Sequence, residues 1–203
     1  MDLERLEREL KKRLPYDYKW GRKQEDNWDG LTNFIYQTYS FETLLKKIDG
    51  FNQQLKDYAM NRWYNFWSAM AVENIFCSHQ NVVANKNNYD KLIDFRINDI
   101  PFDHKTTVFP KNFGNTYQYA MNNEKELIEW LYENQSSQGR QHFGNRLFIV
   151  LYDSNGNHWK MKSEILKLKN AIDLYVNNFS ENNLIKMDFG NGIVYSSILW
   201  VSK

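Results

Sequence analysis

Residues 89–109 read YDKLIDFRINDIPFDHKTTVF, and this stretch decides the fold. Two segments of strand-type residues, 92–97 and 100–108, lie on either side of Asn98 and Asp99. Asn and Asp tolerate the backbone conformations that a tight two-residue turn requires. The stretch therefore predicts a β-hairpin.

The register of this hairpin would place Asp94 opposite Asp103, with Lys105 two residues further along on the same face. Two facing carboxylates destabilise a strand pair by roughly 0.2–1 kcal/mol at an exposed site, and more where water is excluded. A cation between them would reverse the sign of that effect. Such a site suits Mg²⁺, with Mn²⁺ as a substitute. The alternative is a solvated hairpin face that carries ordinary charges.

Residues 51–79 predict the longest helix, and Glu73 lies on its apolar stripe. A buried carboxylate without a partner is costly, so Glu73 needs one. Arg62 and Arg96 are possible structural partners. The other possibility is that Glu73 faces the two aspartates and contributes to the metal site.

Asp94, followed by Asp103, His104 and Lys105 on the next strand, resembles the PD-(D/E)XK nuclease superfamily, which includes many restriction endonucleases. The resemblance implies that the acids bind a divalent metal, that the lysine assists hydrolysis of a phosphodiester, and that His104 offers a backbone carbonyl to the metal. It also favours a metal-site role for Glu73, because the family often has a helical acid before its strands.

The family core is a helix, a three-stranded meander, a second helix and a further strand, and the resemblance covers about residues 61–152. Ile93 stands where the family frequently has proline. The spacing between the two acids is short, which the tight turn explains.

The rest of the chain predicts a mixed α/β protein. Residues 147–152, LFIVLY, form a continuous apolar run that predicts a central strand covered on both faces. Residues 111–122 read as a loop. Further helices are expected at 2–14, 40–48, 123–134 and 163–176, and further strands at 82–83, 158–161, 184–188 and 193–201.

We therefore expect an α/β (α+β mixed sheet) fold: a restriction endonuclease-like core with a central mixed β-sheet flanked by helices. Residues 1–50 would form a helical, aromatic-rich region packed on a core at 51–203, as a single domain overall. No clean period appears in residues 16–39, which read as a packed connecting segment.

Polar and basic residues near the expected active face are candidates for nucleic-acid contacts. Arginines could bind phosphates, and glutamines could read base edges. The alternative is an ordinary exposed connection between a helix and a strand. The candidates are Lys111, Gln138, Arg140, Gln141 and Arg146.

Composition narrows the classes of protein. The 203 residues include seven Trp, thirteen Tyr and thirteen Phe, so the chain can fill a large core. A formal net charge of +1 gives no global basic field, and any nucleic-acid binding would rest on local patches. The single Cys77 excludes an internal disulfide and suits a reducing compartment.

No apolar signal region opens the sequence, and no run of about 18 apolar residues occurs. We expect a cytoplasmic protein without membrane contact. Glycine-rich nucleotide motifs are absent, so no organic cofactor is expected.

These features lead to the hypothesis of a Mg²⁺-dependent endonuclease that acts on DNA. One alternative is a non-catalytic module on the same core that binds nucleic acid or protein. Another is a nuclease for RNA or branched DNA, since specificity resides in loops and oligomer geometry. Double-strand cleavage would call for a homodimer.

Overall fold

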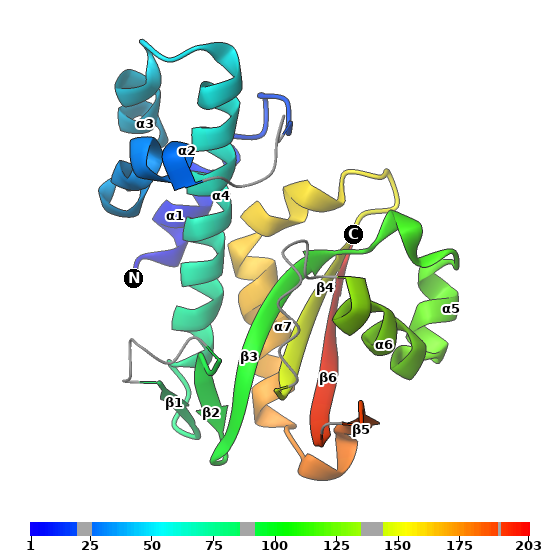
Figure 1. Cartoon of the computed structure of the whole chain (residues 1–203). Coiled ribbons are helices and arrows are strands. Elements are labelled where there is room, and N and C mark those ends of the chain that lie inside the picture. The colour runs from blue at the N-terminus through cyan, green and yellow to red at the C-terminus, as the bar shows by residue number, and fades with distance from the viewer. Residues whose placement is uncertain (20–25, 86–91, 135–143, 191) are drawn as a thin grey trace. The chain divides into compact units, whose positions relative to one another are not determined.

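The computed structural model describes residues 1–19, 26–85, 92–134, 144–190 and 192–203 (Figure 1). The chain divides into two compact units. Unit 1 comprises Met1–Asn74 and Lys162–Leu166, and unit 2 comprises Ile75–Met161 and Lys167–Lys203. This division differs from the predicted boundary at residue 50, because the long helix expected in the core belongs to unit 1 as far as Asn74.

Unit 1 is helical, and two of its helices, α1 and α3, begin at capping side chains. Asp2 accepts a hydrogen bond from the backbone N–H of Arg5, and Ser40 accepts one from Thr43. Such caps satisfy backbone donors that have no partner inside the helix. The helical elements are α1 (Leu3–Lys11), α2 (Asp26–Thr32), η1 (Asn33–Gln37), α3 (Phe41–Ile48) and α4 (Gln53–Phe76).

Two buried arginines tie unit 1 together. Arg13 donates to the side chain of Asn61 over 2.7 Å and to backbone carbonyls. Arg62 pairs with Asp29 and donates to the hydroxyl of Tyr36 over 2.6 Å. A buried charge is tolerated only with such partners, so these networks explain how the helical unit holds guanidinium groups in its interior.

Unit 2 is built on a six-stranded mixed sheet with strand order β1-β2-β3-β4-β6-β5. The central strands β3, β4 and β6 run parallel, whereas the strands at both edges are antiparallel to their neighbours. The strands are β1 (Val82–Ala84), β2 (Phe95–Ile97), β3 (Ile100–Val108), β4 (Arg146–Tyr152), β5 (Ile185–Asp188) and β6 (Ile193–Ser202). The fold-class prediction, a mixed sheet flanked by helices, is confirmed.

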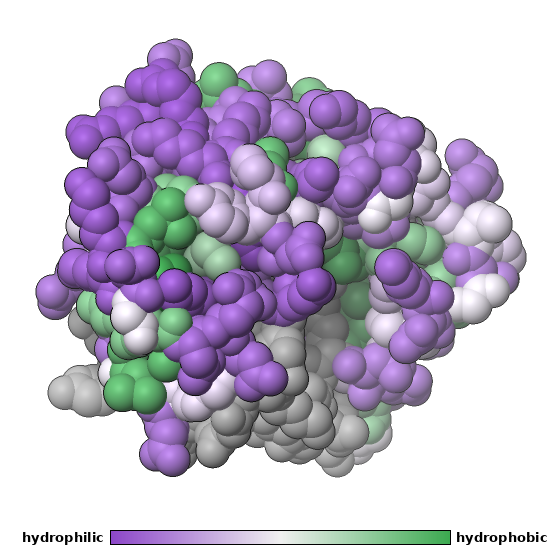
Figure 2. Space-filling model, turned by 90° about the horizontal axis from the view of Figure 1, so that it is seen from above, coloured by the Kyte–Doolittle hydropathy of each residue, from purple (hydrophilic) through white to green (hydrophobic). Residues whose placement is uncertain are grey.

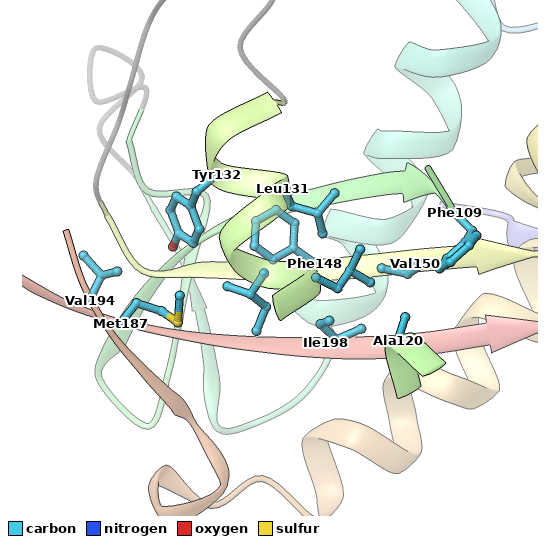
Figure 3. Close-up of a cluster of buried hydrophobic side chains, with 11 residues drawn as sticks. Phe109, Ala120, Leu131, Tyr132, Phe148, Val150, Met187, Val194 and Ile198 are labelled. Carbon is cyan, nitrogen blue, oxygen red and sulfur yellow. The ribbon is translucent and has the colours of Figure 1, made fainter. Parts of the chain in front are cut away.

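Helices cover both faces of this sheet (Figure 1). On one face, Leu127 and Leu131 of α6 belong to one buried cluster with Phe148, Val150 and other sheet residues (Figure 3). The other face meets α7, and Phe179 just after that helix contacts the ring of Phe102. The unit 2 helices are η2 (Lys111–Phe113), α5 (Tyr117–Asn122), α6 (Glu124–Asn134), η4 (Glu181–Asn183), and the parts of η3 (His158–Ser163) and α7 (Ile165–Asn177) that fall within its residues.

Strand β4 is the centre of the fold. Its residues from Leu147 to Leu151 are fully buried, as the apolar run predicts for a strand covered on both faces. The closing hairpin of β5 and β6 is also confirmed.

Three local predictions are wrong. The expected loop at 111–122 contains η2 and α5, where the Thr116 hydroxyl caps α5 and small Ala120 enters the core. The expected strand at 158–161 is the 3-10 helix η3, and the connecting segment at 16–39 contains α2 and η1. Ring packing stabilises these short elements, with a capping hydroxyl as well in α5, and neither leaves an apolar period to detect.

The face seen from above in Figure 2 is mainly hydrophilic. In the view of Figure 2, hydrophobic residues form small groups among polar ones. In the described ranges, the longest helix, α4, is not apolar enough to pass through a lipid bilayer, and neither is any other.

Candidate functional site

The candidate site is organised by the hairpin of β2 and β3. Asn98 and Asp99 have positive φ values of 47° and 66°, which a two-residue turn of this type requires. The predicted register is confirmed for the three pairs nearest the turn, from Ile97 with Ile100 to Phe95 with Phe102.

The ladder ends one pair before the predicted pairing of Asp94 with Asp103, and this part of the prediction is wrong. The backbone N–H of Asp94 donates to the carbonyl of Phe102 over 2.9 Å. The Asp94 carboxylate instead accepts two hydrogen bonds at Oδ2, from the backbone N–H of His104 at 2.8 Å and from its Nδ1 at 2.7 Å. The side chain thus replaces the ladder partner that the strand edge lacks.

Asp103 contacts two cations. Lys105 Nζ lies 2.8 Å from Oδ1, and Arg146 Nε lies 3.3 Å from Oδ2. The Arg146 contact is an ion pair without hydrogen-bond geometry, because the buried Nε has no hydrogen-bond partner among the described residues. The Asp103 side chain is 11% exposed, so both charges act on a largely dehydrated carboxylate.

The two aspartates have opposite pKa shifts. Burial raises the pKa of Asp103, and this effect together with repulsion from Asp94 outweighs the charges of Lys105 and Arg146. Burial also acts to raise the pKa of Asp94, but the hydrogen bonds and charge of His104 more than offset it and lower that pKa below its ordinary value. The charge of Lys105 lowers the pKa of both carboxyl groups, and the charge of Asp94 raises the pKa of Asp103.

The parallel register explains why Arg146 reaches Asp103. Asp103, Arg146 and Ser196 are paired across β3, β4 and β6, so their side chains point to the same face. The next row on that face contains Phe148 of the α6-covered core. Asp103 therefore lies beside the hydrophobic core and not on an open hairpin face.

Arg146 is thus placed differently from the sequence prediction. It begins β4 and is 7% exposed, whereas the prediction put it in an exposed connection as a phosphate contact. Its guanidinium carbon lies 5.0 Å from the ring centroid of Tyr132. The sequence does contain a signal for this placement. Arg146 comes directly before the apolar run, so it is expected to be the first residue of a buried strand and not part of an exposed loop.

His104 has its side chain on the sheet face opposite to Asp103, as alternation along a strand requires. Its ring stacks on Phe95 with centroids 5.8 Å apart. The N–H and C=O of one strand residue point to the same side, and the His104 N–H points at Asp94. Its carbonyl is therefore directed toward the Asp94 side of the strand.

These groups supply oxygen donors of the kind that a hard cation takes. Asp94, Asp103 and the His104 carbonyl supply oxygens, and Mg²⁺ typically takes one or two carboxylates while keeping several waters. Within the described ranges, no group of three or more His, Cys, Asp or Glu side chains is arranged to hold a metal ion. Binding here would therefore rely on these oxygens and on water.

The roles of the other predicted residues in this site stay predictions. Glu73 lies on α4 in unit 1, and its part in the site stays a prediction. Lys111 is exposed at the start of η2. Gln138, Arg140 and Gln141 lie outside the described residues.

Comparison with protein-family models, with curated proteins and with solved structures finds no match to this chain.

Proposed function

We propose that unit 2 carries a Mg²⁺-dependent endonuclease site that hydrolyses phosphodiester bonds of DNA, with Mn²⁺ as a possible substitute. The observation that carries the proposal is the arrangement of Asp103 with Lys105 at 2.8 Å, beside an Asp94 carboxylate held at the His104 peptide. Two interacting carboxylates are unfavourable for folding, and a bound cation would offset that cost.

In this proposal Asp94 and Asp103 hold the cation, with the His104 carbonyl as a further oxygen donor. A bound divalent ion supplies a water of lowered pKa and neutralises charge on the phosphate. Lys105, whose side chain is 44% exposed, orients the attacking water and stabilises the negative charge that develops on the phosphoryl oxygens.

The order of elements also supports the proposal. Helix α4, the meander of β1, β2 and β3, helix α6 and strand β4 follow one another in the sequence that the resemblance implies. Strand order places β4 directly beside β3, which carries the acids. A homodimer would supply the second site that double-strand cleavage needs.

Replacing Asp103 with Asn tests the proposal. We expect the wild type to nick plasmid DNA with Mg²⁺ and Asp103→Asn to do so roughly 100-fold more slowly or not at all, because a preorganised charge at the reacting centre is lost. Asp99→Asn is the matched control. It removes a carboxylate from the same hairpin, and the Asn side chain tolerates the positive φ at that position.

Equal cleavage by Asp103→Asn and wild type would refute the assignment. The same assay on single strands, branched DNA and RNA defines the substrate class. Calorimetry with Mg²⁺ separates the proposal from a non-catalytic binding module on this fold, which needs no metal uptake.

A further inference from the structure

Arg146 is the residue of this site that the sequence assigned to a different task. A phosphate contact has to reach solvent, but the Arg146 side chain is 9% exposed and its nearest anion is Asp103. The chain just before it is tied to both neighbouring strands by a side chain. The side-chain amide of Asn145 donates to the Pro101 carbonyl of β3 over 3.1 Å and accepts from the Tyr195 N–H of β6 over 2.8 Å.

The guanidinium group is also enclosed by neighbouring side chains. Tyr132 of α6 places its ring beside it, and the Tyr132 hydroxyl is fixed by Ser196 and by the Gly144 carbonyl, each at 2.7 Å. A planar guanidinium between a ring and a carboxylate has little freedom to move. Arg146 is therefore a fixed charge.

Lys105 differs from Arg146 in both exposure and mobility. Its side chain is 44% exposed, and its ammonium is a point charge on a flexible stem. The two cations contact different oxygens of Asp103, Lys105 at Oδ1 and Arg146 at Oδ2. The Asp103 carboxylate thus has a buried partner, Arg146, that stays in place, and a partly exposed partner, Lys105, that can move to another ligand.

We propose that Arg146 is a positioning residue that anchors Asp103 through Oδ2 and so presents Oδ1 to the ligand side of the site. This inference rests on the proposed function and extends it. When Lys105 moves to a phosphate or a water, the Asp103 carboxylate keeps its orientation because Arg146 does not move with it.

The test compares Arg146→Gln and Arg146→Lys with Lys111→Gln, a change at an exposed lysine that the sequence assigns to phosphate binding. A positioning residue affects kcat. We expect Arg146→Gln to lower kcat roughly ten-fold or more, with KM for DNA and the salt dependence of DNA binding unchanged, and Arg146→Lys to recover part of kcat. A phosphate contact raises KM and reduces the slope of log K against log salt by about one.

A raised KM and a reduced salt slope in Arg146→Gln, with kcat retained, would overturn the inference. If Arg146→Gln does not fold, Arg146→Lys carries the same test. An intermediate kcat is then expected, since a lysine cannot reproduce the rigid planar contact, and a wild-type kcat contradicts the proposal.

A second measurement separates this inference from the proposed function. Urea unfolding of Arg146→Gln, Lys105→Gln and the double variant at pH 8 needs no catalysis. Because both cations act on one buried carboxylate, the midpoint shift of the double variant should differ from the sum of the single shifts. Additive shifts would refute the shared anchor, whereas absent cleavage with non-additive shifts would refute only the nuclease.

Discussion

Asp94 and Asp103 interact electrostatically, but protein stability depends on their charges in opposite ways. The ionised form of Asp94 is stabilised by hydrogen bonds from His104, so its pKa lies below the ordinary value of 3.8. The ionised form of Asp103 is opposed mainly by burial, so its pKa lies above that value. The Asp94 charge therefore stabilises the folded state at neutral pH, and the Asp103 charge costs stability there.

Substituting each aspartate by Asn should therefore give opposite results in metal-free protein at pH 7. Asp94→Asn should lower the free energy of unfolding by about 1.5 kcal/mol, the low end for hydrogen bonds to a charged group. Asp103→Asn should leave the free energy of unfolding unchanged or raise it. Urea unfolding measures both values.

The pH dependence of these differences checks their cause. The Asp94→Asn loss should persist at pH 4 and shrink only as the pH falls through the lowered pKa, below 3.8. The Asp103→Asn gain should disappear as the pH falls from the raised pKa toward 3.8. A loss of stability in Asp103→Asn at pH 7 would show that the Lys105 and Arg146 pairs outweigh burial.

Among the secondary-structure elements, the hairpin turn has the strongest local requirement. Asp99 has a φ of 66°, a conformation that costs a non-glycine residue with a Cβ roughly 1–2 kcal/mol unless its side chain bonds locally. Asp99→Ala should therefore reduce the free energy of unfolding by about 1 kcal/mol. Asp99→Gly should retain or increase it, because Asn-Gly is a preferred pair in such turns.

Chemical denaturation of both Asp99 variants measures this difference. The Arg96 side chain donates to the backbone carbonyl of Asp99, so neither variant removes that bond. Equal stabilities for the Ala and Gly variants would mean that the turn does not define the register.

The sequence predicted elements well where a cap or a period marks them. Ser40 begins α3 and an unbroken apolar run forms β4, both as expected. Helix α5 was missed because its contribution to the core is one small residue, Ala120, and an aromatic ring. That ring, Tyr117, stacks on the ring of Tyr152 with centroids 3.9 Å apart. This contact exists only after the sheet has formed.

On the scale of the whole molecule, the predicted role of Glu73 as a metal ligand is still to be tested. It belongs to unit 1, whereas Asp94 and Asp103 belong to unit 2. If Glu73 is a further ligand, as the resemblance implies, its removal changes the affinity for Mg²⁺.

Glu73→Gln should then weaken Mg²⁺ binding about ten-fold in calorimetry, the lower end of the effect expected for a group that supports a metal site. Asp57→Asn, a substitution at a half-buried position in the first part of the same helix, is the control. Unchanged Mg²⁺ affinity in Glu73→Gln would confine the site to unit 2 and leave Glu73 a structural role. Location in the cytoplasm and the homodimer also stay predictions.

The sequence by itself determined the hairpin, its three-pair register and the buried central strand, because turn conformation and hydrophobic burial act between residues close in the chain. Only the tertiary structure decided the partners of the acids. Arg146 reaches Asp103 through the parallel register of β3 with a distant segment, and Asp94 binds His104 because the ladder ends before it. Both outcomes depend on which strands become neighbours and on how far water is excluded, and neither quantity is encoded in local spacing.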